Sequence, residues 1–95
     1  MSSIVFDNRK VVAAAGTAEA LEASAHEVAY AIIVAETNNT GVIAVGDTTV
    51  VAAVGTRRGV PLNAGDTVTL YGVDLNKIYI DATVSGDGVT YADWG

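Results

Sequence analysis

The segment from residue 26 to residue 36, HEVAYAIIVAE, has the most regular pattern of side-chain sizes in the chain. In an extended strand, alternate side chains point to opposite faces, so each face can be read from every second residue. One face carries Val28, Tyr30, Ile32 and Val34, and the other carries Ala29, Ala31, Ile33 and Ala35. Both faces are apolar, which is typical of a central strand covered on two sides. We expect the larger residues to face the interior, and the smaller ones to face a loop or a neighbouring subunit.

Two later segments repeat this alternation and extend the predicted interior. Residues 67–71 place Thr67, Thr69 and Tyr71 outward, and residues 77–84 alternate apolar Ile78, Ile80, Ala82 and Val84 with outward Lys77, Tyr79, Asp81 and Thr83. A shared period of two predicts a common core face. The predicted core consists of Val28, Tyr30, Ile32, Val34, Val68, Leu70, Ile78 and Ile80.

Glycines separate these runs, which are rich in Val, Ile, Thr and Tyr. Short strands with regularly spaced turn signals predict an all-β fold, here a small antiparallel β-sandwich or barrel formed by residues 1–95 as a single domain. Gly46-Asp47 predicts a hairpin between residues 42–45 and 48–54. Gly86-Asp87-Gly88 predicts the turn of a last hairpin, and Pro61 predicts a position at a sheet edge or in a loop.

Two segments allow more than one interpretation. Residues 17–25, TAEALEASA, have the local propensity of a short helix, yet so short a helix is marginal by itself, and we favour an extended segment or short strand. Residues 1–10 contain little apolar surface and form a candidate extended arm that binds a neighbour. A frayed terminus without a partner is the alternative interpretation.

Composition narrows the classes of partner. The chain has 51% hydrophobic residues and a net charge of −6, with five basic residues and eleven acidic ones. The apolar fraction is high for so short a chain and predicts burial against other subunits, whereas the acidity disfavours nucleic acid. No cysteine is present, and no apolar run is long enough to cross a membrane or to serve as a secretory signal. We therefore expect a protein made in the cytoplasm that does not bind membranes.

The residues with reactive side chains do not form a recognisable catalytic set, so we expect no enzymatic activity. His26 is the sole histidine, and its place at the start of a strand is more typical of a strand-edge polar group than of a general base. Asp47, Asp66, Asp74 and Asp87 fall in turns, where aspartate commonly bonds nearby backbone. The sequence therefore predicts no catalytic residue, no metal ligand and no cofactor.

A few charged and aromatic residues are candidates for partner contacts. Arg57 and Arg58 form the only concentrated positive charge and could contact an acidic patch, although a solvated loop is the alternative. Phe6 is the candidate apolar anchor of the N-terminal segment, with Arg9 and Lys10 as its charges. Trp94 belongs with the tyrosines to a set of aromatic residues suited to a sugar platform or to a subunit interface.

One series of motifs resembles a known class of proteins. It comprises Asn39-Thr40-Gly41, the VIAVG run ending at Gly46, Gly59-Val60-Pro61-Leu62 with Gly65, and Asp74-Leu75 leading into Ile78-Tyr79. The series is similar to a pattern in small virion proteins of tailed bacteriophages, namely head decoration proteins and head fibres, and the similarity covers residues 21–91. Ala44 departs from it where an aromatic residue is frequent, and Asn63-Ala64 replaces the more usual Pro-Gly.

The resemblance implies a non-enzymatic β-sandwich that binds the major capsid protein on the outer surface of the virion and stabilises the particle as a symmetric homo-oligomer, often a trimer. The alternative is a receptor- or carbohydrate-binding module of a phage fibre or tail. Clustered exposed aromatic residues, with carboxylates converging in a groove, would favour this alternative.

Overall fold

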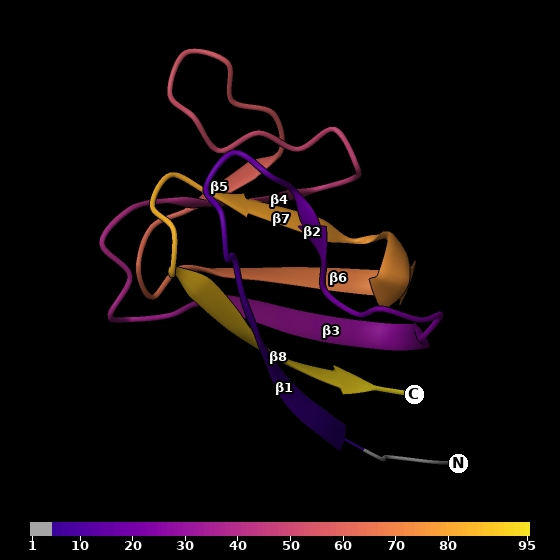
Figure 1. Cartoon of the computed structure of the whole chain (residues 1–95). Coiled ribbons are helices and arrows are strands. Elements are labelled where there is room, and N and C mark those ends of the chain that lie inside the picture. The colour runs from indigo at the N-terminus through magenta and orange to yellow at the C-terminus, as the bar shows by residue number, and fades with distance from the viewer. Residues whose placement is uncertain (1–4) are drawn as a thin grey trace.

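The computed structural model describes residues 5–95, which form two stacked antiparallel sheets of four strands each (Figure 1). The first sheet has the order β1 (Val5–Val11), β8 (Gly88–Trp94), β3 (Glu27–Ala35) and β6 (Thr67–Asp74). The second sheet has the order β2 (Glu19–Ala20), β7 (Tyr79–Ala82), β4 (Ile43–Gly46) and β5 (Val60–Leu62), and a 3-10 turn, η1 (Leu75–Lys77), precedes β7. The predicted all-β sandwich is confirmed.

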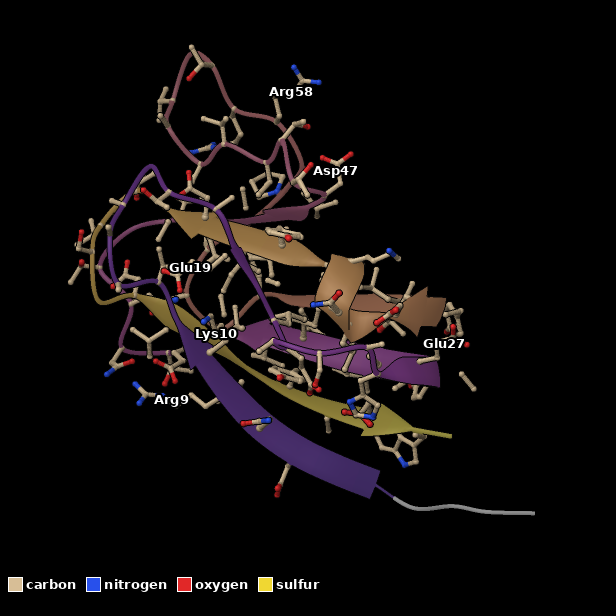
Figure 2. The ribbon with its side chains drawn as sticks, turned by 45° about the vertical axis from the view of Figure 1, so that its right-hand side comes forward. Arg9, Lys10, Glu19, Glu27, Asp47 and Arg58 are labelled. Atoms are coloured by element: carbon tan, nitrogen blue, oxygen red, sulfur yellow. The ribbon has the colours of Figure 1, made fainter. Side chains whose placement is uncertain are left out.

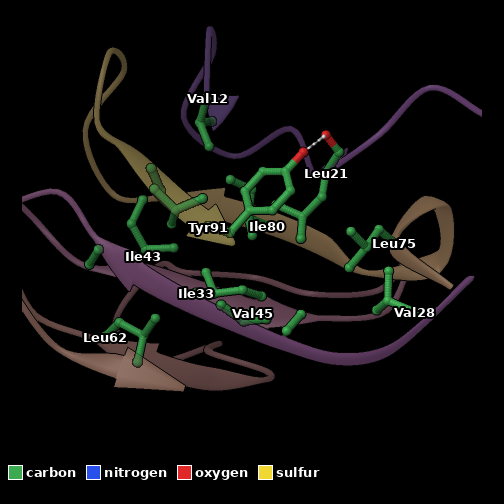
Figure 3. Packing of buried hydrophobic residues seen from close by; sticks show 14 residues of the cluster. Val12, Leu21, Val28, Ile33, Ile43, Val45, Leu62, Leu75, Ile80 and Tyr91 are labelled. Carbon is green, nitrogen blue, oxygen red and sulfur yellow. Dashed lines mark hydrogen bonds between the residues drawn. The ribbon is translucent and has the colours of Figure 1, made fainter. Parts of the chain in front are cut away.

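The core lies between the two sheets and draws residues from both (Figure 3). Ile33 and Val89 of the first sheet and Ile43 and Ile80 of the second are completely inaccessible to solvent. Leu75 of η1 closes the core at one end. The buried members are Val12, Leu21, Val28, Ala31, Ile33, Ala35, Ile43, Val45, Leu62, Leu75, Ile80, Ala82, Val89 and Tyr91.

The predicted facing of the central strand β3 is wrong over most of its length. Ala31, Ile33 and Ala35 are buried between the sheets, whereas Tyr30, Ile32 and Val34 are half-buried on the outer face. The other predicted core members fit: Val28 and Ile80 are buried, and Val68, Leu70 and Ile78 pack against the core. Ala31 and Ala35 face inward together with the large Ile33, and the opposite sheet adds Ile43, Val45 and Ile80 to the same core.

The strand changes its inward phase between Val28 and Ala31. Val28 pairs with Val73, and Ala31 pairs with Leu70, and all four residues belong to the core or pack against it. These two pairs are three positions apart, whereas a regular strand repeats every two. Gly72 lies between them on β6 with a φ of +59°, a left-handed conformation that glycine adopts without a steric penalty. Near Gly72, therefore, β3 and β6 both change which alternate residues face the core.

The segment that follows β4 is a covering loop rather than the second strand of a hairpin. Residues 47–59 leave the sheet, with a bridge between Val51 and Arg58 inside the loop, and β4 pairs with β5 and β7 instead. The loop places Val50 and Ala52 against Ala44 in a second, smaller buried cluster. This predicted hairpin is wrong because the loop buries its own apolar residues on the outer face of the second sheet.

The last predicted hairpin is also wrong, although its turn is present. Asp87 N–H donates to the Val84 carbonyl, but β7 belongs to the second sheet and β8 to the first, so this turn connects the two layers. Consequently Val84, predicted to be inside, is 40% exposed. Asp81, predicted to point outward, does so from its strand and is nevertheless buried under the loops of the second sheet.

Two other local predictions are confirmed. Residues 17–25 are extended and contain the two-residue strand β2, not a helix. Pro61 lies in β5, the edge strand of the second sheet, where its missing N–H leaves no internal pairing unmet.

The segment expected to be an arm belongs to the sheet from Val5 onward. All seven residues of β1 pair with β8, from Val5 opposite Trp94 to Val11 opposite Gly88. Seven paired residues fix this segment as an edge strand because its backbone groups bond to β8, so the extended-arm prediction is wrong for residues 5–10. Residues 1–4 of the predicted arm lie outside the described residues. Over the described part of the chain, no helix is long and apolar enough to cross a membrane.

Candidate binding surface

The outer face of the first sheet is an apolar surface that no other element in the described part of the chain covers. Register places Ile32 of β3 between Thr69 of β6 and Ala92 of β8, with Tyr30 and Val34 on either side along the strand. These side chains are half-buried, since neighbouring strands of the sheet flank them and, among residues 5–95, no second layer lies above them. We call this surface the open face; it comprises Tyr30, Ile32, Val34, Thr69, Tyr71, Ala92 and Trp94.

Three aromatic side chains from three strands meet at one end of the open face. The ring of Tyr30 lies 5.3 Å from that of Tyr71 and 4.9 Å from that of Trp94, measured between centroids, and both pairs are tilted. Such pairs contribute about 0.5–1.5 kcal/mol beyond the area they bury. Tyr71 is 71% exposed, so the cluster presents aromatic surface to solvent from a fixed position.

A shallow groove continues from the aromatic cluster towards the other end of the open face. Its volume is about 630 Å³, and Ile32, Val34 and Ala92 form part of its lining. β1 supplies the polar wall of the groove through Asp7, Asn8 and Arg9, and Thr90 lies on β8. The groove thus has an apolar lining from the central strands and a polar edge from β1.

The charge at this edge is largely paired. Two guanidinium nitrogens of Arg9 donate hydrogen bonds to the carboxylate of Glu36: Nε to Oε2, and Nη2 to Oε1 over 3.1 Å. These hydrogen bonds raise the pKa of Arg9 above its usual value. Arg9 therefore remains charged at every physiological pH and contributes a fixed ion pair at the rim.

The structure separates the predicted contact residues. Arg9 and Trp94 lie on or beside the open face, whereas Lys10 points to the other side of β1, with Nζ 3.0 Å from Glu19 Oε1 (Figure 2). The Phe6 backbone pairs with Asp93, and its side chain lies outside the described part. Arg57 and Arg58 lie on the covering loop at the opposite end of the molecule, where Arg57 Nε donates to the Ala52 carbonyl over 2.9 Å.

Sequence reasoning missed the three β3 residues of the open face because it placed them in the interior. The available signal was that both faces of the strand are apolar. This pattern identifies two apolar surfaces but does not show which of them is buried in the interior. It also missed a cluster of Glu22, His26 and Asp93, whose ligand atoms all lie within 4.8 Å of one another. No sequence spacing indicates that cluster, since Asp93 follows His26 by more than sixty residues.

Comparison with known proteins finds no matching family model, no matching curated protein and no matching solved structure.

Proposed function

We propose that this chain is a non-enzymatic structural protein of a bacteriophage virion, a capsid decoration protein that binds the outer capsid surface and stabilises the particle. The observation that carries the proposal is the open face: an ordered apolar surface on one sheet of a sandwich whose other sheet is covered by its own loop. The resemblance of the turn and strand motifs to head decoration proteins supplies the class of partner.

The composition of the open face suits protein binding. Aromatic residues are enriched at the centres of protein interfaces, where they supply large rigid contact areas at low conformational cost. Trp94 and Tyr71 provide such anchors, and Tyr30 holds both by direct ring contact. The rim of Asp7 and the Arg9–Glu36 pair matches the polar edge that commonly surrounds an apolar interface centre.

The net charge of the chain restricts the charge that the partner surface can carry. At a net charge of −6, the protein approaches neutral or basic surfaces more readily than acidic ones. The major capsid protein is the proposed partner, and its site for this chain would be an apolar patch with a neutral or basic border. Arg57 and Arg58, on the far loop, would then face away from the capsid.

Stabilisation by decoration requires no chemistry. A ligand that prefers the assembled state shifts the assembly equilibrium by mass action, and many copies add their contributions over one particle. A symmetric homo-oligomer, with a trimer as the favoured form, would place several open faces on one capsid site at once. Such multivalent attachment strengthens binding without any new type of contact.

Particle binding by paired variants tests the proposal. Ile32→Lys puts a charge at the centre of the open face, and we expect it to reduce occupancy on undecorated particles of the encoding phage at least about tenfold, as loss of a central interface residue does. Val54→Lys makes the same type of change at a site that is 83% exposed on the covering loop, and we expect full occupancy. Cryo-electron microscopy of the particles measures both occupancy and the face that binds.

Particle stability gives the second measurement. Decorated particles should retain their genome to a higher temperature than undecorated ones, and adding the wild-type protein back should restore the difference. Equal genome-release temperatures would contradict the stabilising role. Full occupancy by the Ile32→Lys variant would show that another surface of the protein contacts the capsid.

The aromatic cluster supports one alternative, a carbohydrate- or receptor-binding module of a fibre or tail. Sugars stack on exposed aromatic rings, and Tyr71 and Trp94 offer rings beside a groove with the carboxylate of Asp7. This alternative predicts that a host-surface glycan binds the wild type and that Trp94→Ala abolishes this binding. Binding to a glycan panel, with no binding to capsids, would favour it over decoration.

A further inference from the structure

Where β3 begins and β8 ends, His26 lies between two carboxylates from distant parts of the chain. Its Nδ1 lies 2.8 Å from Glu22 Oε1, and its Nε2 lies 3.4 Å from Asp93 Oδ1. Glu22 and His26 belong to the segment between β2 and β3, and Asp93 belongs to β8. The cluster therefore spans two elements that only the fold brings together, and it lies outside the open face.

Asp93 is the unusual member of this cluster. Its side chain is 1% exposed, and neither carboxylate oxygen accepts a hydrogen bond from the residues that the structure describes. A buried carboxylate normally accepts several hydrogen bonds or binds a cation, because removal from water strongly disfavours its charge. Within the described residues, Asp93 therefore pairs with His26 but accepts no hydrogen bond, so its acceptor capacity is available to a cation.

The separation of His26 Nε2 and Asp93 Oδ1 suits two ligands of one metal ion. At 3.4 Å, the distance exceeds the usual range of an N–H···O hydrogen bond. Zinc binds histidine nitrogen and carboxylate oxygen at about 2.0–2.2 Å in a tetrahedron, so two of its ligand atoms lie roughly 3.3–3.6 Å apart. The two atoms already have this spacing.

The other ring nitrogen of His26, Nδ1, lies beside a carboxylate, an arrangement common in metal sites. A metal-binding histidine typically donates its second N–H to a carboxylate, which fixes the tautomer and the ring orientation. Glu22 Oε1 is placed to accept from Nδ1, and Glu22 Oε2 in turn lies 3.0 Å from the Tyr91 hydroxyl. Tyr91 also lies 3.2 Å from the Leu21 carbonyl, so the orienting carboxylate is itself anchored (Figure 3).

We propose that His26 and Asp93 bind a divalent transition-metal ion of the zinc class, with Glu22 as the residue that positions the His26 ring. A mixed nitrogen and carboxylate set favours Zn²⁺ over Ca²⁺ and Mg²⁺, which prefer oxygen ligands alone. The side chains of His26 and Glu22 are 29% and 20% exposed, which leaves a path for the ion and for water as the remaining ligands. The metal would fasten the segment before β3 to the last strand.

The test uses the full chain without a histidine tag, freed of metal with a chelator. Isothermal titration with zinc chloride should show one site per chain, and zinc should raise the thermal unfolding midpoint as its concentration increases. Calcium and magnesium chlorides at the same concentrations should leave the midpoint unchanged. Absence of both heat and a midpoint shift with zinc would overturn the proposal, leaving a histidine held by two acids.

Three variants and a control separate the roles of the residues. Asp93→Asn keeps the shape and removes a buried charge, so it should remain folded while losing zinc binding, and His26→Gln should lose it as well. Glu22→Gln should bind about 10- to 100-fold more weakly, as loss of an orienting partner does. Glu36→Gln, at the carboxylate that pairs with Arg9, should bind like the wild type. Unchanged zinc affinity in Asp93→Asn or His26→Gln would also overturn the proposal.

Discussion

Buried aspartates fasten the loops of this protein at the residue scale. Asp81 is 1% exposed, and its two oxygens accept hydrogen bonds from Gly16 N–H over 2.9 Å and from Ala52 N–H over 2.8 Å. Asp87 similarly accepts from the N–H groups of Thr40 and Gly41. Each carboxylate thus binds backbone of other segments and replaces bonds that a sheet partner would supply. These loops are ordered by side chains of the strands and turns beneath them.

The Lys10–Glu19 pair joins the two sheets and has a defined pH dependence. The hydrogen bond from Lys10, followed by that from Ala13 N–H, holds the pKa of Glu19 below its usual 4.5. A lowered pKa in the folded state stabilises the fold fully above about pH 4.5, and this stabilisation is lost as the pH falls through the folded pKa.

We expect Glu19→Gln to lower the free energy of unfolding at neutral pH by about 0.2–1 kcal/mol, the range of partly exposed ion pairs. The difference from wild type should shrink as the pH falls from about 4.5 through the lower folded-state pKa of Glu19, because below that pKa the Glu19 carboxyl is protonated and as neutral as glutamine. Urea unfolding across this pH range measures it. Glu27→Gln, an exposed change at the start of β3 (Figure 2), serves as the control, and a constant difference at all pH values would contradict the assignment.

At the scale of the element, β3 carries two apolar faces with unequal burial. Ile33 is completely buried between the sheets, whereas its neighbour Ile32 is half-buried on the open face. The two residues are chemically identical and adjacent, so they form a matched pair for measuring what each face contributes. The difference between them reports burial alone, without a change of side-chain type.

Ile33→Ala should lower the free energy of unfolding by about 2–5 kcal/mol, because it leaves a cavity in a closed core. Ile32→Ala should cost clearly less, since solvent can occupy the space that the side chain leaves on an uncovered face. Chemical denaturation of both variants measures the difference. Equal losses, or a larger loss for Ile32→Ala in the monomeric protein, would mean that the facing of β3 is reversed.

At the scale of the whole molecule, the two sheets are covered differently. The covering loop of residues 47–59 packs Val50 and Ala52 on the outside of the second sheet, whereas the first sheet keeps its outer face open. A molecule this small, extending 44 Å along its longest axis and 19 Å along its shortest, buries a smaller fraction of its surface than a larger protein does. Its 51% of hydrophobic residues therefore supplies more apolar side chains than the single core between the sheets uses.

We expect the protein to form oligomers in solution, with a trimer at about three times the chain mass of 9.7 kDa. The physical reason is the gain from burying apolar surface that one chain leaves exposed. Sedimentation velocity at micromolar concentration measures the state, and a species of 9.7 kDa alone would contradict the prediction.

The variant Ile32→Lys adds a second readout to that experiment. If the open face contacts the capsid, this variant should form the same oligomer as wild type while losing attachment to particles. Dissociation of the oligomer by this substitution in the absence of capsids would instead assign the open face to contacts between copies. Val54→Lys, on the covering loop, is the matched control in both measurements.

Local sequence patterns were sufficient to predict the class of the fold and several of its local features. β-branched runs separated by glycine predicted an all-β sandwich, and Pro61 predicted an edge position, because both depend on local backbone preferences. The run 17–25 has helical local propensity, and its extended form was predicted because so short a helix is marginal by itself. The identity of the apolar positions along β3 was also visible in the sequence. Among the candidates for partner contacts, Arg9 was named as a charge of the N-terminal segment and Trp94 as one of the aromatic residues.

Which of the two apolar faces of β3 lies in the interior, and which residues distant in sequence come into contact, depend on how the two sheets pack together. Ile32 and Ile33 are equivalent in the strand pattern, and the packing of the second sheet buries only Ile33. Gly46-Asp47 is compatible with a hairpin, but residues 47–59 instead form a loop that buries Val50 and Ala52, and β4 pairs with β7 and β5. Glu22, His26 and Asp93 become neighbours because the segment before β3 packs beside β8. Periodicity describes one strand at a time, whereas burial and convergent side chains are properties of pairs of elements.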